Sequence, residues 1–373
     1  MYVFAVTQLS HYLLRHPTVA GAMQTGLLLA MVWLLWAYTT WVTNWLDPDR
    51  IAVRLLLLAL MLASLVMSAA LPDAFGAGGL IVGCAYAAMQ IGRSAFAVAG
   101  LQGQLLQRNF QRILAWCVLS GALAVLGGLA HGTARELLWL SAVGVDLLGG
   151  AAGFYTPGLG RSSTQEWNIE GGHFAERCQA FILIALGESI VVTGATLACL
   201  LSASHGVGWE VVAAFLTAFV GSAGLWWIYF DRSASESARV IAGSADPGRL
   251  GRSAYHLIHP IMVAGIIVGA AADEIVLSHP AARSTVPLAW MVLGGTAPYI
   301  AGHLAFTAVV WRRASWPRIA ALVVLALLGL LAPHVSALAL SACTAAVVVL
   351  VAAWDYAIGS APARLCLTGS RRP

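Results

Sequence analysis

The feature that most constrains this chain is the recurrence of long apolar stretches along the whole of its 373 residues. Each stretch covers about 20 residues, the length that an α-helix needs to cross the hydrocarbon core of a bilayer. Because backbone groups inside that core must be paired within the chain, such stretches fold as spanning helices. Charged residues make up only 10% of the sequence, against about 25% in soluble proteins. The sequence therefore predicts an all-α polytopic membrane protein.

We expect about 12 membrane-spanning helices. They are predicted over residues 1–14, 22–45, 51–71, 78–101, 111–130, 136–155, 173–201, 209–230, 253–276, 286–311, 317–333 and 337–357. The first segment is shorter than a full span, so we expect the sequence to begin inside a truncated helix. The predicted parts are a first six-helix repeat over 1–155, a cytoplasmic linker over 156–172, a second six-helix repeat over 173–357 and a cytoplasmic disordered tail over 358–373.

The distribution of arginine over the connecting loops predicts the orientation in the membrane. With these segments, 15 of the 20 basic residues fall on one side, and only Arg15, Arg135 and Arg283 fall on the other. Cytoplasmic loops carry the excess of basic residues, so the C-terminus is predicted to be cytoplasmic. The net charge of +4 is spread over short loops and does not indicate nucleic-acid binding. The lipid bilayer is the partner that the composition implies.

Four pairs of segments indicate an internal repeat. In chain order, the pairs are 5–10 with 185–190, 35–41 with 226–232, 60–73 with 261–274, and 92–98 with 302–308. The offset grows from 180 between Gln8 and Glu188 to 210 between Arg93 and His303, as loop insertions would produce. Because each repeat has an even number of helices, the two halves are predicted to be parallel, related by an axis along the membrane normal.

Three stretches carry a resemblance to a known family. They are FAVTQLSHYLL near the start, LWAYTTW in the second predicted helix and, most specifically, FAERCQAFILIALGESIVVTGAT. Together they resemble the bacterial low temperature requirement protein A family over essentially the whole chain. The resemblance implies a multi-pass protein of the bacterial cytoplasmic (inner) membrane with a role in growth in the cold. Family members usually carry an E-L-F-x-D-L-V-like segment before the first stretch, and its absence here agrees with a truncated first helix.

Ionisable side chains inside the predicted helices are the first functional candidates, because burying a charge in the membrane is costly. Glu188 lies near the middle of its helix beside Ser189, and Arg177 lies eleven residues earlier on the same face. Two interpretations stay open for Glu188. It binds a proton or cation, or it pairs with Arg93, either as a counter-ion or as a buried structural pair.

Arg93 and His303 occupy equivalent repeat positions, and Gln8 stands where the second half has Glu188. Arg93 and His303 have two interpretations. They face a shared cavity suited to an anionic substrate or a proton relay, or each forms its hydrogen bonds within its own half. Aromatic residues of the second helix in each half either line a substrate path or pack. The secondary candidates are Asp146, Trp227, Tyr229 and Tyr38.

His256 and His259, like His173 and Glu176, have an i, i+3 spacing that can bind a metal. Neither pair has a third ligand at a diagnostic spacing, so histidines at helix ends are the favoured interpretation. No nucleotide-binding, nucleophile-elbow, zinc-protease or haem motif is present in the sequence. We predict no metal and no cofactor.

The leading functional hypothesis is a secondary transporter or exchanger of a small solute or ion, with a site near the bilayer midplane between the two repeats. The alternative is a membrane-embedded enzyme or sensor acting on lipid or envelope components, with His256, His259, Glu176 and Asp231 at the cytoplasmic face. A third possibility is a non-catalytic envelope protein needed for growth in the cold. The sequence favours a protein that is not an enzyme without deciding the question.

Overall fold

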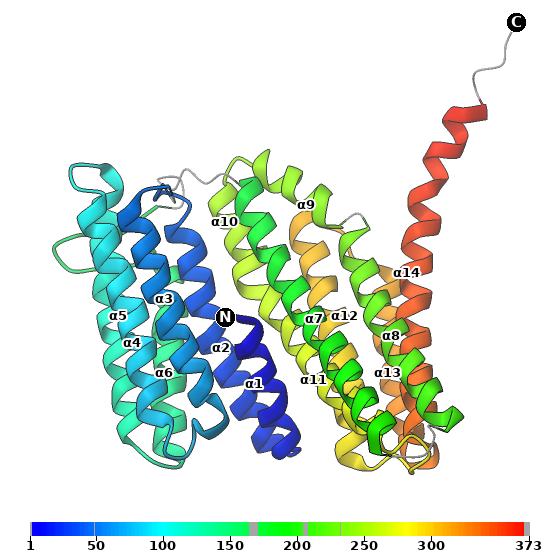
Figure 1. The fold of residues 1–373 in the computed structure, drawn as a ribbon. Helices are drawn as coiled ribbons and strands as arrows, with labels where there is room; N and C mark the ends of the chain where they lie inside the picture. The colour runs from blue at the N-terminus through cyan, green and yellow to red at the C-terminus, as the bar shows by residue number, and fades with distance from the viewer. Residues whose placement is uncertain (1, 48, 164–170, 204–207, 232, 369–373) are drawn as a thin grey trace, which may run out of the picture. The chain divides into compact units, whose positions relative to one another are not determined.

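The computed structural model describes residues 2–47, 49–163, 171–203, 208–231 and 233–368. Within these ranges the regular structure is helical and contains no strand (Figure 1). The long helices are α1 (Tyr2–Arg15), α2 (Val19–Val42), α3 (Ile51–Ala70), α4 (Gly79–Gly100), α5 (Leu105–Leu129), α6 (Thr133–Ala151), α7 (Gly171–Ala203), α8 (Trp209–Phe230), α11 (His259–Ser278), α12 (Val286–Trp311), α13 (Trp316–Leu331) and α14 (Ala337–Thr368). The short ones are η1 (Leu71–Asp73), α9 (Ser233–Ala242), α10 (Pro247–Gly251), η3 (Arg252–Ile258) and η4 (Ala332–His334).

The all-helical fold expected from the sequence is confirmed. Each predicted segment overlaps one long helix, and ten helices in the described ranges are long and apolar enough to cross a membrane. The helices α1, with 14 residues, and α6, with 19 residues, are not among those ten. The total of 12 spanning helices therefore stays a prediction.

The structure differs from the expected segments in two places. The connection over 231–252 contains α9 and α10, which were not predicted because they are short and polar. Helix α14 extends to Thr368, beyond the predicted end of this segment at residue 357, while the disordered tail stays a prediction.

The chain divides into two compact units. The first contains residues 1–184 and 241–260, and the second contains residues 185–240 and 261–373. Helices α7, α9 and α11 contribute residues to both units. Each unit is described below by itself.

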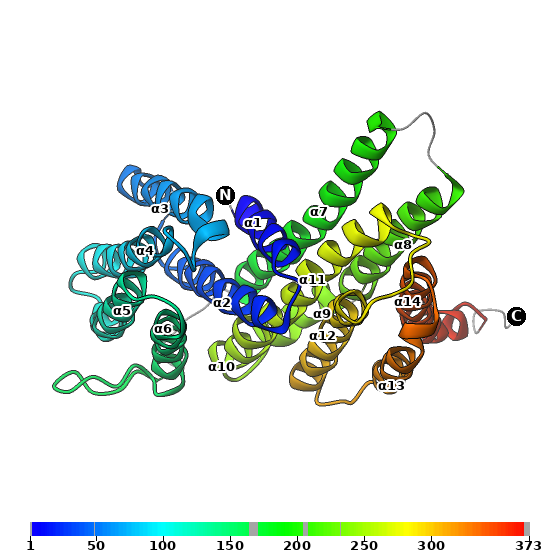
Figure 2. The ribbon, with the colours of Figure 1, turned by 90° about the horizontal axis from the view of Figure 1, so that it is seen from below.

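In the first unit, α4 is the central helix and packs against α2, α3 and α5, while α6 packs against α5 and α2 (Figures 1 and 2). Glycine allows α4 and α5 to approach closely: a side chain at Gly83 would collide with the carbonyl oxygen of Ala124. Small residues at a helix crossing are the usual means of close packing in membranes. The tight contact of α4 with α5 fixes the framework on which the site described below is built.

Arg135, in the first turn of α6, was expected to be a loop residue but is 2% exposed. Its guanidinium donates to the main-chain oxygens of Gly127 and Ala130 near the end of α5, at 3.2 and 3.0 Å. It also donates to those of Ala74 and Gly76 after η1, at 2.8 and 2.7 Å. Arg135 thus satisfies carbonyl groups that the end of a helix leaves without partners.

We expect Arg135→Ala to lower the free energy of unfolding by about 2–3 kcal/mol, because it leaves buried carbonyl groups without donors. Thermal melting of the purified protein in detergent measures the effect. The control is Arg283→Ala, which removes an exposed arginine. Equal melting temperatures for the two variants would contradict the structural role of Arg135.

In the second unit, α8 packs against α14, and α12 packs against α13 and α14. Helices α11 and α12 cross where a Cβ at Gly265 would meet the carbonyl oxygen of Gly295. The Tyr299 hydroxyl donates to the carbonyl oxygen of Leu225 at 2.6 Å and connects α12 with α8. Close contacts of this kind hold α8, α11 and α12 together.

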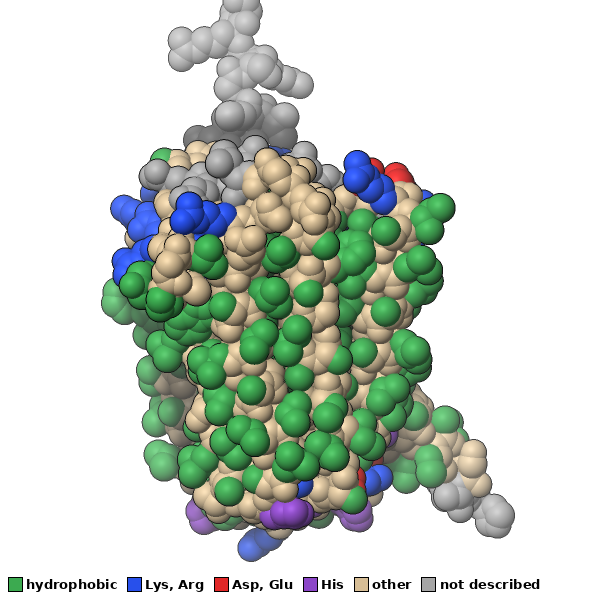
Figure 3. Space-filling model, turned by 90° about the vertical axis from the view of Figure 1, so that its left-hand side faces the viewer, with side chains coloured by type: hydrophobic (Ala, Val, Ile, Leu, Met, Phe, Trp, Pro, Cys, Tyr) green, Lys and Arg blue, Asp and Glu red, His purple; other side chains and the backbone are tan. Residues whose placement is uncertain are grey.

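Large apolar side chains remain exposed along the middle of the helices. On α3, Leu55, Leu58 and Leu62 are 61%, 58% and 64% exposed. Figure 3 shows one face on which hydrophobic side chains cover the middle, arginines gather at one end and histidines at the other. Such a surface would aggregate in water, and it fits contact with lipid chains.

Candidate functional site

The candidate site of the first unit centres on Asp146, which is 1% exposed on α6. Its Oδ2 accepts hydrogen bonds from two side chains of α4, the Tyr86 hydroxyl and Nε2 of Gln90, the latter at 2.6 Å. From α2, the Tyr38 hydroxyl donates to the main-chain oxygen of Asp146 at 3.1 Å. Three helices are therefore joined at one carboxylate-bearing residue.

The network continues to Arg93, which is completely buried. Its guanidinium donates to Oε1 of Gln90, so this amide lies between the positive charge and the carboxylate. The other terminal nitrogen donates to the Leu35 carbonyl at 3.4 Å and the Thr39 hydroxyl at 3.3 Å, and the guanidinium carbon lies 5.2 Å from the centre of the Tyr38 ring. The charges of Arg93 and Asp146 thus balance within one unit.

Tyr86, Gln90 and Arg93 belong to one face of α4 because they are spaced i, i+4 and i+7. Within the described residues, Oδ1 of Asp146 has no hydrogen-bond partner. A buried carboxylate oxygen without a donor is costly. Oδ1 of Asp146 is therefore the acceptor of this network that remains available.

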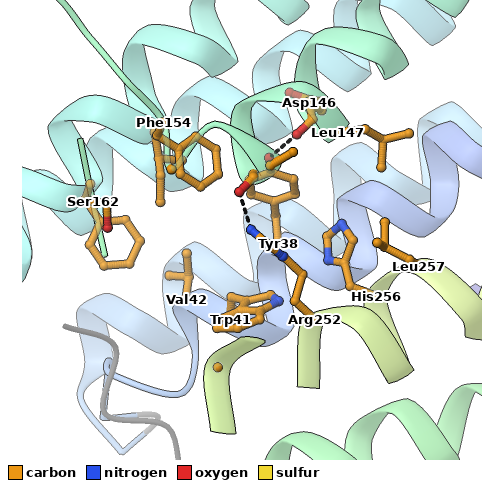
Figure 4. Close-up of a pocket in the computed structure, with 16 residues that line it drawn as sticks. Tyr38, Trp41, Val42, Asp146, Leu147, Phe154, Ser162, Arg252, His256 and Leu257 are labelled. Carbon is orange, nitrogen blue, oxygen red and sulfur yellow. Dashed lines mark hydrogen bonds between the residues drawn. The ribbon is translucent and has the colours of Figure 1, made fainter. Parts of the chain in front are cut away.

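A cavity of about 140 Å³ lies next to this network (Figure 4). The walls come from α2, α5, α6, the 153–162 turn, α10 and η3. Lining residues with aromatic, charged or titratable side chains are Tyr38, Trp41, Phe110, Asp146, Phe154, Arg252 and His256. In Figure 4, Tyr38, Arg252 and His256 gather around the same space. Phe154 reaches it from a left-handed backbone conformation (φ 50°) just after α6.

Arg252 and His256 belong to η3, which is π-helical. The Arg252 guanidinium donates to the main-chain oxygen of Gly150 at the end of α6. The His256 ring centroid lies 6.0 Å from that of Tyr38, and its buried Nδ1 has no hydrogen-bond partner within the described residues. Single π-helical turns inside helices are frequent at functional sites, which agrees with the position of η3 beside the cavity.

The predicted metal candidates do not converge. His259 is buried, its Nδ1 lies 3.1 Å from the Ala254 oxygen and its ring packs on Tyr255, whereas His256 faces the cavity. Glu176 is exposed on α7, and the side chain of His173 lies outside the described residues. Among the residues that the structure describes, no group of three or more His, Cys, Asp or Glu side chains could hold a metal.

The candidates of α1 and α7 have different surroundings. Arg177 donates to the Thr43 hydroxyl and, at 3.3 Å, to the Thr40 oxygen, so it joins α7 to the end of α2. Gln8 is partly buried on α1. Two further candidates are buried on α7 in the second unit. They are Glu188, which is 1% exposed, and Ser189, whose hydroxyl lies 2.8 Å from that of Ser222.

In the second unit, His303 is completely buried beside an ion pair. Its Nδ1 accepts a hydrogen bond from Nε of Arg318 at 2.9 Å, and the two terminal nitrogens of Arg318 contact the Asp355 carboxylate at 2.6 and 3.2 Å. The Tyr229 ring lies 6.3 Å from the His303 ring. Trp227, by contrast, is 42% exposed and packs near Tyr356.

Several residues of these networks were not predicted. Tyr86 and Gln90 could have been found, because they share a helix face with Arg93. Arg318 was counted among the loop arginines, although it is 4% exposed. Arg252 was likewise assigned to a loop, and nothing in the sequence indicates that η3 brings it to a cavity.

Long apolar helices that enclose paired charges, with leucines left exposed on their outer faces, define a polytopic helical membrane protein. The model of the bacterial low temperature requirement A protein (LtrA) family matches residues 1–353, so the chain belongs to this family. The chain is also similar to an uncharacterized protein of Rhizobium meliloti (strain 1021). The two are 33% identical over 358 residues, which cover 95% of this chain and 86% of that protein. No solved structure matches the chain.

Proposed function

We propose that this LtrA-family protein is a secondary transporter or exchanger of a small solute or ion in the bacterial cytoplasmic membrane. The observation that carries the proposal is the cavity of the first unit, which adjoins the buried network around Asp146. Polar groups inside a membrane bundle mark substrate or ion paths more often than they add stability. The expected site between two repeats remains a further prediction of the same hypothesis.

The lining of the cavity indicates the class of solute. Tyr38, Trp41, Phe110 and Phe154 offer aromatic surface to an apolar group. Arg252 offers a guanidinium, the side chain best shaped to bind a carboxylate or phosphate. The solute that fits both is a small organic anion with an apolar part.

The location of the cavity suits entry from the cytoplasm. It lies where α2 and α6 end and α5 begins. The neighbouring loops contain Arg50 and Arg161, and the first turns of α3 and α5 contain Arg54 and Arg108. Under the positive-inside rule this end of the unit is cytoplasmic, as is the C-terminus. A surplus of positive charge near the entrance would also attract an anion.

Equivalent contacts in the two units support the proposed duplication. The repeat aligns Tyr38 with Tyr229 and Arg93 with His303, and in each unit the tyrosine ring packs against its basic partner. In each unit the second and sixth helices of the repeat also contact each other, α2 with α6 and α8 with α14. Secondary transporters are frequently built from such repeats.

The carboxylates of the two networks extend this correspondence. Asp146 of α6 and Asp355 of α14 are 209 positions apart, close to the offset of 210 between Arg93 and His303. Asp146 is connected to Arg93 through Gln90 of α4, and Asp355 is connected to His303 of α12 through Arg318 of α13. The pattern supports two related halves that have diverged in their polar residues.

A ligand screen tests the proposal. Small organic acids and their neutral amides are added to the purified protein in detergent, and melting temperatures are measured. We expect an acid, but not its amide, to stabilise the protein, because binding to the native state raises its stability. Arg252→Gln should weaken the affinity about tenfold or more, the usual effect of losing a charge-assisted hydrogen bond.

The matched control is Arg249→Gln, which neutralises an exposed arginine of the neighbouring α10. The acid that binds is then tested for gradient-driven uptake into proteoliposomes. If the acid binds and is chemically converted but is not taken up, the protein is a membrane enzyme and the transporter proposal is wrong. If no acid stabilises the protein, or if both arginine variants respond alike, the cavity is not the solute site.

A further inference from the structure

The second unit contains a separate cavity of about 50 Å³ among α7, α8, α11, α12 and α14. This volume holds a few water molecules, since about 10–15 Å³ of such space holds one. Its walls combine glycines, one carboxylate, Asp273, and a group of hydroxyl side chains. The hydroxyls are those of Ser189, Thr217, Ser222, Thr296, Ser341 and Thr344. All of the residues that line this cavity are uncharged apart from Asp273.

Asp273 is the unusual residue of this cavity. It lies in α11, inside one of the ten apolar spans, and is partly buried. Within the described part of the chain it forms neither a hydrogen bond nor an ion pair. An ionised carboxylate without a partner is costly at this position. A cation or a proton held in the cavity would neutralise the carboxylate that no described side chain pairs.

The hydroxyl groups present oxygen lone pairs to the cavity. Thr217 and Thr344 donate their protons to carbonyl oxygens one turn back on their own helices, at 2.8 and 2.9 Å. The hydroxyls of Ser189 and Ser222 lie 2.8 Å apart, so one proton serves that pair. A hydroxyl whose proton is used in this way still has lone pairs to offer as an acceptor or a ligand.

Ser341 provides independent evidence for a ligand. Its side chain lines the cavity, is 7% exposed, and has no hydrogen-bond partner within the described residues. Buried hydroxyls are normally satisfied. Ser341 and Asp273 line the same cavity, so a bound group could contact the hydroxyl and the carboxylate together.

We propose that this cavity binds one monovalent metal cation, for which Na⁺ has the best-matched chemistry. Hard cations take oxygen ligands, and the cavity offers carboxylate and hydroxyl oxygens without a competing basic side chain. One carboxylate balances one positive charge, whereas divalent ions bound by protein oxygens usually have more than one carboxylate ligand. Binding itself does not depend on transport; a role as coupling ion rests on the proposed function.

Sodium binding is tested on the full chain in detergent. NaCl is titrated against choline chloride at constant total salt, and the melting temperature is followed. We expect a saturable rise with Na⁺ in the native protein and no rise in Asp273→Asn. Ser341→Ala, which removes one oxygen, should weaken the Na⁺ affinity about tenfold. The matched control is Glu274→Gln, a neutralised neighbour that does not line the cavity and should respond like the native protein.

Three results would overturn the proposal: equal melting in NaCl and choline chloride, an undiminished response in Asp273→Asn, or stabilisation that follows pH without Na⁺. The last would make the occupant a proton. If Asp273→Asn does not fold, Ser341→Ala decides the matter, and an unchanged Na⁺ affinity in it overturns the proposal. If the protein binds Na⁺ but transports no solute, the sodium site stands and the proposed transport function is wrong.

Discussion

Replacing Asp146 with Ala is expected to lower the free energy of unfolding by about 3–5 kcal/mol, because it leaves two buried donors and a buried charge uncompensated. The substitution removes the acceptor of Tyr86 and Gln90 and leaves the buried charge of Arg93 without its counterpart. Titration of the folded protein with SDS in mixed micelles measures the effect. Glu274→Ala is the control, because it removes a carboxylate of α11 that lines neither cavity.

A double substitution tests whether Gln90 really couples the two charges. Arg93→Leu and Asp146→Leu should each be strongly destabilising, but the double variant should cost less than their sum, because it leaves no lone charge in the interior. We expect a coupling of about 1–3 kcal/mol between the two positions. Strict additivity would show that Gln90 does not transmit the charge of Arg93 to Asp146.

Arg318→Ala is expected to destabilise the protein by about 3–5 kcal/mol as well, and to do so in the second unit. This side chain is 4% exposed and contacts His303, Ser315 and Asp355. Its loss leaves the buried imidazole without a donor at Nδ1. SDS titration again measures the change, and Arg313→Ala, an exposed neighbour, should stay within about 0.5 kcal/mol of the native protein.

A conservative variant separates the ion pair from the rest of the contacts. Asp355→Asn keeps an acceptor for Arg318 but removes the negative charge, so its cost should fall clearly below that of Arg318→Ala. Asp355 is the more exposed partner, with 27% of its side chain accessible. Equal losses in the two variants would mean that charge alone matters and that the contact with His303 contributes nothing.

The helices could be predicted from the sequence because the bilayer restricts both their length and their composition. Each apolar stretch from residue 19 to residue 357 became one helix, and turns such as the one after Asp73 fell where the hydrophobic pattern breaks. The short helices α9 and α10 were missed because they carry no apolar stretch of spanning length. The π-helical η3 was missed because it has no sequence signature of its own.

The candidate site was less predictable because its contacts join helices that are distant in the chain. Arg93 and Asp146 were both recognised as buried ionisable residues. They are connected through Gln90, which was not a candidate because it is neutral. For His303 the sequence left open a shared cavity or separate satisfaction within its own half, and it did not indicate Arg318 as the partner of Nδ1. Spacing along one helix reveals which residues share a face, but not which helix that face meets.

The π-helical η3 places Arg252 and His256 at the wall of the first cavity. A π-turn contains one residue more than the corresponding α-helical turn. Deleting a single residue there would restore ordinary α-helix and rotate everything before the deletion by about 100° relative to α11. The apolar pattern of α11 would survive, while Arg252 would turn away. In this fold the loss of one codon would remove Arg252 from the wall of the cavity while the spanning helix α11 stayed intact.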